Sequence, residues 1–210
     1  MFGRGRSELD KGLDAFAARH WRNARKHLED AVIEAPRAIG DFHLGLLYWR
    51  GLGGEKDHRA AVHHFRRAAE AGHAAAQTAL GLAVQAGVGA PKDEAQARAL
   101  FRSAAGAGDV EAMTQLAALS DKAEALALLR RASDAGHPPA MRLLADAIMG
   151  DDPIEALGLL YAHVSLTGNH AVSRHAEDLA RELRADEIDA ALKRGRVLLK
   201  QLKRQDRRTR

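Results

Sequence analysis

The sequence predicts an all-α fold built from repeated pairs of helices. Residues 38–73 and 74–109 are two copies of one unit, with 15 identical residues in 36 aligned positions and no gap. A repeat of about 20 to 50 residues is typical of a solenoid, in which stacked units bury a shared core. Hydrophobic residues make up 46% of the chain but aromatic residues only 4%, so the core must consist largely of alanine and leucine, which suits helix-on-helix packing. Very few segments show the alternating β-branched pattern of strands.

Each full unit is interpreted as a first helix, a glycine loop, a second helix and a tight return. In the first copy the first helix covers about residues 38–48, and the glycines of residues 51–54 end it, because glycine adopts the left-handed conformation that stops a helix. Asp57 is expected to cap the second helix, which carries Phe65 on its apolar face. Asp93 is the corresponding cap in the second copy.

Less regular helical segments flank these two units. The predicted divisions are a divergent N-terminal helical pair over 1–37, four repeats over 38–73, 74–109, 110–137 and 138–170, C-terminal capping helices over 171–203, and a basic, disordered tail over 204–210. The third repeat lacks eight residues of the loop between its helices. The last helix has an apolar stripe interrupted by Gly195, as expected of an element that covers the exposed core of a final repeat.

The sequence of the first copy carries a family resemblance. It contains Leu44-Gly45-Leu46-Leu47-Tyr48, Gly51-x-Gly53, Asp57, Ala61, Phe65 and Ala68-Ala69-Glu70-x-Gly72. This pattern resembles the Sel-one-like repeat family, whose tetratricopeptide-like α/α units carry two glycines in the loop between their helices. The second copy keeps the glycines but has Val84 in place of the tyrosine. The resemblance implies a right-handed α/α superhelical solenoid that acts as a protein–protein adaptor, with structural rather than catalytic motif residues.

Catalytic, metal and cofactor sites are not expected. The chain has no cysteine, which excludes disulfides, thiol nucleophiles and thiolate metal sites, and sets it apart from the secreted, cysteine-rich members of the family. The glycine loop lacks the preceding strand and the Gly-Lys-Ser/Thr ending of a P-loop. His58, His63 and His64 form the densest histidine group but include no i, i+4 pair. No signal peptide or transmembrane-length segment is found, so we expect a cytoplasmic protein that is not an enzyme.

Positive charge is concentrated at the C-terminal end. Residues 193–210 contain nine Lys or Arg against Asp206 alone, a local charge of +8, whereas the whole chain carries +4. The residues proposed to act in this basic tail are Lys200, Lys203, Arg204, Arg207, Arg208 and Arg210. The tail either contacts nucleic acid, anionic lipid or an acidic partner, or is a solvated helix end that keeps the protein soluble. The absence of interleaved aromatic residues argues against binding to single strands.

The first helix of the first copy supplies the candidate partner-binding residues. If Leu44, Leu47 and Tyr48 face the core, neighbouring side chains lie on the concave surface of the solenoid. The residues expected there, with their counterparts in later repeats, are Phe42, His43, Leu46, Trp49, Arg50, Thr78, Gln85, Thr114, Gln115 and Arg142. Alternatively, Phe42 and Trp49 pack against the N-terminal pair.

The predicted function is a monomeric or weakly self-associating adaptor that binds another protein on this concave face. Under this hypothesis Trp49→Ala weakens partner binding and changes thermal stability little. The alternative hypothesis is a regulatory protein whose basic tail binds nucleic acid or another anionic surface while the repeats dock a partner.

Overall fold

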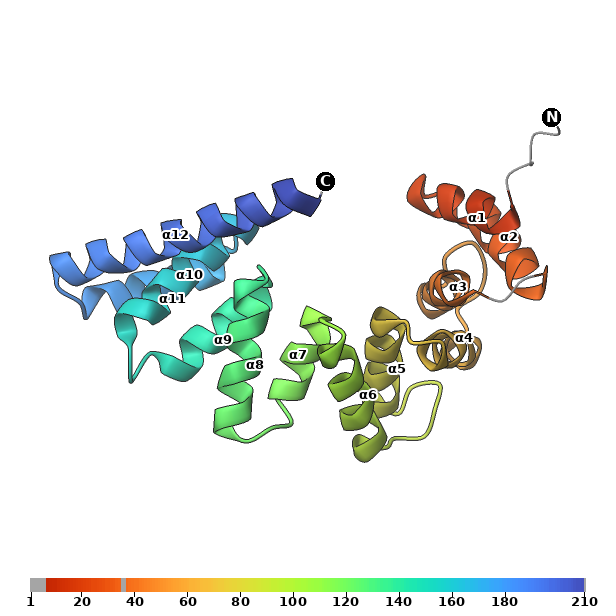
Figure 1. Cartoon of the computed structure of the whole chain (residues 1–210), viewed down its shortest axis with the longest axis horizontal. Helices are drawn as coiled ribbons and strands as arrows, with labels where there is room; N and C mark the ends of the chain where they lie inside the picture. The colour runs from red at the N-terminus through yellow and green to blue at the C-terminus, as the bar shows by residue number, and fades with distance from the viewer. Residues whose placement is uncertain (1–6, 35–36, 210) are drawn as a thin grey trace. The chain divides into compact units, whose positions relative to one another are not determined.

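The computed structural model describes residues 7–34 and 37–209, which form a succession of helices joined by short loops (Figure 1). These residues contain twelve α-helices and no β-strand, which confirms the predicted all-α fold. The helices are α1 (Glu8–Ala17), α2 (Trp21–Glu34), α3 (Ala38–Arg50), α4 (His58–Glu70), α5 (Ala74–Ala86), α6 (Glu94–Gly106), α7 (Val110–Ala117), α8 (Lys122–Asp134), α9 (Pro138–Ile148), α10 (Pro153–Thr167), α11 (His170–Arg181) and α12 (Ala185–Thr209).

The helices belong to two compact units, Met1–Ala112 and Met113–Arg210. Helices α1 to α6 lie in the first unit and α8 to α12 in the second, and the boundary falls within α7. In the part of the chain that the structure describes, no helix is both long enough and apolar enough to cross a membrane.

The two helices of each full repeat meet at a glycine and a phenylalanine. Phe65 of α4 and Phe101 of α6 are only 2% and 0% exposed. A β-carbon at Gly45 of α3, or at Gly81 of α5, would lie 2.6 Å from the ring of the corresponding phenylalanine. Only glycine therefore lets the two helices approach this closely, because a packed interior has no room for a further methyl group. This contact explains why both copies share the glycine and the phenylalanine.

The first glycine of each loop ends a helix. Gly51 and Gly87 cap α3 and α5 in the left-handed conformation, with φ angles of 67° and 70°. The chain then returns to begin the second helix, where the side chains of Asp57 and Asp93 each accept a hydrogen bond of 2.9 Å from a backbone N–H in the first turn. The predicted glycine stop and aspartate caps are therefore present in both copies.

The second glycine of each loop packs against the preceding helical pair. Gly53 and Gly89 have φ angles of 78° and 76°, and each lies against the carbonyl group of the first residue of a preceding second helix. A β-carbon would lie 2.3 Å from the carbonyl oxygen of Trp21 in the first case and of His58 in the second. This backbone-to-backbone approach joins one helical pair to the next within the first unit.

Helix α12 crosses α10 at a pair of glycines in the second unit (Figure 1). A β-carbon at Gly158 would lie 2.9 Å from the carbonyl oxygen of Ala191, and one at Gly195 would lie 2.6 Å from the carbonyl oxygen of Gly158. Ala191 is fully buried at this crossing. Gly195 interrupts the apolar stripe of α12 because the backbones of the two helices meet there.

The predicted disordered tail from residue 204 is wrong for residues 204–209, because α12 continues to Thr209. Residues 201–208 are Gln, Leu, Lys, Arg and Asp without glycine or proline, and most of these residue types form helices readily. Basic side chains also interact favourably with the negative end of the helix dipole. Residue 210, and with it the predicted role of Arg210, lies outside the described residues, and the side chain of Arg208 is not described.

Candidate interaction surfaces

Phe42 and Trp49 lie mainly inside the first unit. The ring of Phe42 stacks on His73 with the centroids 4.6 Å apart, and the ring of Trp49 meets His58 edge-on at 4.5 Å. Both side chains are partly buried against the core cluster that contains Phe65. They therefore pack towards α4 and α5. The sequence led us to expect them either on the concave surface or against the N-terminal pair, and neither placement describes them fully.

Two of the predicted surface residues are buried. Thr78 is 4% exposed and Thr114 is 7% exposed. The hydroxyl group of Thr78 lies 3.2 Å from the backbone oxygen of Ala74 and 3.1 Å from the side chain of Asp109, and either oxygen can accept its one proton. The assignment of Thr78 and Thr114 to a binding surface is therefore wrong, because both positions are enclosed within the described fold.

The remaining predicted residues are at least partly exposed. Gln85 and Gln115 are half-buried, and Arg50 is exposed. Arg142 lies on α9 of the second unit, where its guanidinium group pairs with Asp146 at 2.7 Å.

The first helices of the two full repeats, α3 and α5, each carry a regular set of side chains on one face. On α3 and α5 this row follows the i, i+4, i+7, i+11 spacing that places side chains on one helix face, and we call it the outward stripe. Its members are Ile39, His43, Leu46 and Arg50 on α3 and their 36-residue counterparts Ala75, Ala79, Leu82 and Ala86 on α5. Ile39 is 41% exposed and Leu82 is 36% exposed, while Leu46 is half-buried. The stripe is therefore mostly apolar, with Ile39, Arg50, Leu82 and Ala86 exposed. Leu46 and Ala79 pack partly against the core cluster that contains Phe65, and the ring of His43 lies 4.7 Å from that of Phe16 in α1.

His43, Leu46 and Arg50 were predicted from the sequence as surface residues, whereas Ile39 and Leu82 were not. The signal for Leu82 was available, because it occupies the repeat position of Leu46. The signal for Ile39 was its position four residues before His43, on the same helix face.

A buried polar cluster distinguishes the first repeat from the second. The carboxylate of Asp41 is 3% exposed, and its Oδ1 lies 2.9 Å from His64 Nδ1 and 3.3 Å from Arg67 Nη1. Burial lowers the pKa of His64, although the neighbouring carboxylate opposes this effect. The second copy has Gln77, Leu100 and Ser103 at these three positions. The cluster therefore belongs to this repeat alone and is not part of the shared repeat pattern.

Tyr48 extends the cluster to α2. Its ring stacks on His64 with the centroids 5.6 Å apart, and its hydroxyl group donates to Glu29 Oε1 at 2.9 Å. The guanidinium group of Arg25 lies 4.0 Å from the centre of the same ring and donates to Glu29 at 3.0 Å. Burial and the bond to Glu29 raise the pKa of Tyr48. These contacts fix α3 between α2 and α4, so the outward stripe sits on a rigid support.

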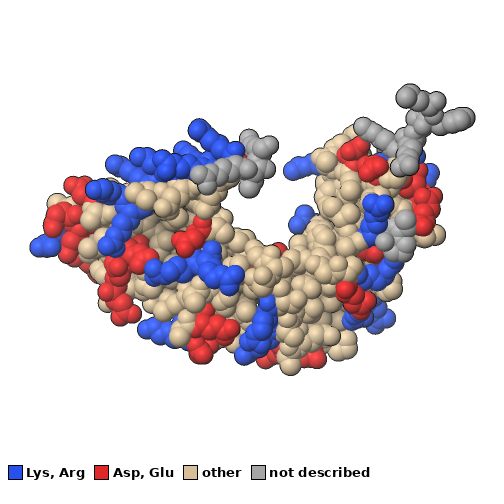
Figure 2. Space-filling model, viewed as in Figure 1, with Lys and Arg blue, Asp and Glu red and all other residues tan. Residues whose placement is uncertain are grey.

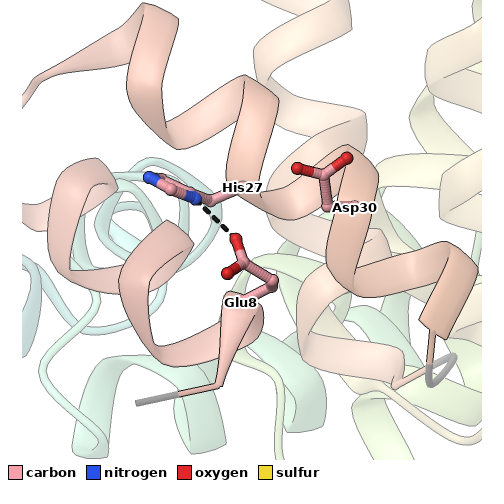
Figure 3. Close-up of side chains that lie close together, drawn as sticks. All are labelled: Glu8, His27 and Asp30. Carbon is pink, nitrogen blue, oxygen red and sulfur yellow. Dashed lines mark hydrogen bonds and ion pairs between the residues drawn. The ribbon is translucent and has the colours of Figure 1, made fainter. Parts of the chain in front are cut away.

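One group of side chains at the N-terminal pair has the chemistry of metal ligands. Glu8 of α1 and His27 and Asp30 of α2 each place a ligand atom within 4.8 Å of the others (Figure 3). Glu8 already contacts His27 Nδ1 at 2.6 Å and Lys11 Nζ at 2.6 Å. The hydrogen bond from Lys11, followed by that from His27, lowers the pKa of Glu8. The contacts of Glu8 with His27 and Lys11 therefore account for the position of Glu8 without a metal ion. His27 was not among the histidines singled out from the sequence, because it lies 19 residues from Glu8 and meets it only through the fold.

The exposed side of α12 is rich in basic residues (Figure 2). Figure 2 shows Lys and Arg side chains gathered along this helix. Arg194 is paired with Asp152 at 3.4 Å, next to a hollow of about 570 Å³ lined by residues of α10 and α12. The predicted tail residues Lys200, Lys203, Arg204 and Arg207 are exposed on this helix.

The geometry defines a protein of stacked α/α repeats, and comparison with known proteins identifies the repeat. Residues 38–73, 74–109 and 111–137 match the Sel1 repeat family. The chain therefore carries three Sel1 repeats, which confirms the resemblance seen in its sequence. The match covers three of the four predicted repeats and does not include the predicted repeat over 138–170. Sel1 repeats commonly serve as scaffolds for protein interactions. None of the curated proteins matches the chain.

Two solved structures have the same fold. A Sel1 repeat protein from Oxalobacter formigenes is 25% identical, with a TM-score of 0.75 over 91% of this chain and 82% of that chain. A protective antigen present in uropathogenic Escherichia coli strains, which displays an SLR fold, is 17% identical with a TM-score of 0.66. That match covers 95% of this chain and 55% of the antigen, and it shows the fold alone. These likenesses confirm the predicted class, an all-α repeat solenoid.

Proposed function

We propose that the chain is a non-enzymatic scaffold that binds a partner protein along the outward stripe of α3 and α5. The carrying observation is the exposure of Ile39 on α3 and Leu82 on α5, at 41% and 36%, where Leu82 occupies the repeat position of the half-buried Leu46. Large apolar side chains that remain accessible in a regular row are typical of a surface that another chain covers. The Sel1 repeats support this proposal, because this class of repeat commonly serves in protein interactions.

The support beneath the stripe favours binding without a large ordering cost. The contacts of Asp41, Tyr48 and His64 hold α3 in place, and the contact between Gly81 and Phe101 fixes α5 against α6. A preformed surface loses little conformational entropy when a partner docks, so more of the contact energy appears as affinity. On α5 the alanines around Leu82 leave space for the side chains of a partner.

The test removes one exposed leucine from the stripe and one from elsewhere. Leu82→Gln is compared with Leu166→Gln, because Leu166 is also an exposed leucine on a helix, 46% exposed on α10. Each tagged full-length form is purified from the native cell with its associated proteins, which are quantified by mass spectrometry. The affinity of the protein recovered with the wild type is then measured by calorimetry.

Loss of the leucine contact should weaken binding by about 1 to 2 kcal/mol, or roughly 5- to 30-fold. The proposal requires this loss for Leu82→Gln and wild-type affinity for Leu166→Gln. Equal affinity of all three forms would show that the partner binds elsewhere.

A further inference from the structure

Helix α12 presents a continuous row of cations on one side. The row, which we call the basic face, consists of Lys193, Arg196, Lys200, Lys203, Arg204 and Arg207, and all six are exposed. With 3.6 residues per turn they fall within an arc of about 100°, and they extend over about 21 Å of helix at 1.5 Å per residue. Figure 2 shows the basic side chains along this helix.

The opposite side of α12 packs against other parts of the second unit. Ala191 is fully buried, Gly195 meets the backbone of α10, and Leu202 packs against Gly136, where a β-carbon would lie 2.9 Å from the leucine side chain. These contacts hold the helix from its first turns to near its end. The basic face is therefore displayed on a rigid element and turned away from the core.

The six cations are not neutralised by other residues that the structure describes. None of them forms an ion pair with another described residue, whereas Arg130, Arg181 and Arg184 of the same unit are all paired with carboxylates. Like charges three or four residues apart on a helix repel each other and destabilise it. The carboxylates near the row are Asp134, which shares a hollow with Arg204 and Gln201, and the exposed Asp189 and Asp206 of α12. An external anion would reduce the repulsion among the six cations.

The density of charges along the basic face is close to that of a phosphate backbone. Six cations separated by five intervals over about 21 Å have a mean spacing of about 4.2 Å, and each strand of a duplex carries one phosphate per roughly 3.4 Å along its axis. We propose that the basic face of α12 is a docking surface for the phosphate backbone of a nucleic-acid duplex. Such contacts position a protein on the duplex without reading its sequence.

Two alternative ligands fit the helix less well. Residues 185–209 contain no aromatic side chain on which bases of a single strand could stack. A membrane surface is favoured by an amphipathic helix that inserts its apolar side, but here that side is buried against α10 and Gly136. Val197, 47% exposed, is the large apolar side chain available beside the row.

The experiment measures binding of full-length protein to fluorescent 24-base-pair DNA and RNA duplexes by anisotropy, at several NaCl concentrations. With six phosphate contacts the logarithm of the affinity should fall against the logarithm of salt with a slope of about −5. Neutralising three cations with Lys200→Gln, Lys203→Gln and Arg204→Gln should reduce this slope by about 2.7 and weaken binding by about 100-fold at 0.1 M salt.

The matched control removes three paired arginines of the same unit, with Arg142→Gln, Arg181→Gln and Arg184→Gln, and should bind like the wild type. Circular dichroism checks that α12 persists. Arg207→Gln, near the end of the helix, keeps the test valid if the triple variant loses helix, and should reduce the slope by about 0.9.

Binding of either duplex that depends on the basic face supports the proposal. The proposal is overturned if the wild type does not bind either duplex at 50 mM NaCl, or if the control variant loses as much affinity as the basic-face variant. Tighter binding to phosphatidylserine vesicles than to either duplex would also overturn it, in favour of a membrane surface. This inference does not depend on the scaffold function of the repeats.

Discussion

The close approach of Gly89 to His58 makes the stacking of the first unit testable with one methyl group. Gly89→Ala places a β-carbon 2.3 Å from the carbonyl oxygen of His58, at a residue whose φ is 76°. The left-handed conformation alone costs a residue with a β-carbon about 1 to 2 kcal/mol. Forcing an extra carbon into a packed contact adds about 1 to 3 kcal/mol. We therefore expect Gly89→Ala to lower the free energy of unfolding by about 2 to 5 kcal/mol.

The chain provides a control for the conformational part of this loss. Gly72 also has a positive φ, 82°, but nothing lies within 4 Å of where its β-carbon would be. Gly72→Ala should therefore cost only the strain of about 1 to 2 kcal/mol. Urea unfolding followed by circular dichroism at 222 nm measures both variants. If they lose equal stability, backbone strain alone explains the glycine, and the proposed role of the loop in joining the helical pairs is refuted.

Two further predictions concern the first repeat. The variant His64→Leu introduces the leucine that the second repeat has at the matching position, Leu100. Burial lowers the pKa of His64 below its ordinary value of 6.5, so the unfolded protein binds a proton at this residue before the folded protein does as pH falls. The wild type should therefore lose stability as pH falls from 7 to 5, and His64→Leu should lose less; identical pH profiles in urea unfolding would contradict this linkage. Trp49→Ala should lower the free energy of unfolding by about 1 to 3 kcal/mol, because the ring packs against Phe65 and His58. Unchanged thermal unfolding of Trp49→Ala would instead restore the surface role that the sequence analysis gave to this residue.

The repeat pattern made the local structure of the first unit predictable from the sequence. Two aligned copies separate positions that the fold requires from positions that vary, so the glycine stops and the aspartate caps could be recognised without coordinates. The structural roles of Gly45 and Gly53 could not be recognised from the sequence, because Gly45 meets a phenylalanine of the next helix and Gly53 meets the backbone of the preceding helical pair. Such contacts depend on how helices pack rather than on the sequence of either helix.

The candidate surface was predicted less well, because the sequence does not fix which side of a helix its neighbours cover. Phe42 and Trp49 were expected either on the concave surface or against the N-terminal pair, yet the rings of His58 on α4 and His73 in the return to α5 cover them. Thr78 was expected beside them and is buried, whereas Ile39 and Leu82 remain exposed.

The end of helix α12 was predicted to be less ordered than it is. Its last residues were expected to be disordered because they contain few hydrophobic groups. Helix-forming residue types and the helix dipole carry α12 on to Thr209, and Leu202 still anchors it against Gly136.

The central claim, that a partner protein lies on the outward stripe, is tested most directly by site-specific crosslinking in the native cell. A photoreactive amino acid replaces Leu82 in one form of the full-length protein and Leu166 in another. The account predicts a discrete adduct with one protein at position 82 and none of that adduct at position 166. The same adducts at both positions, or none at position 82, would contradict it.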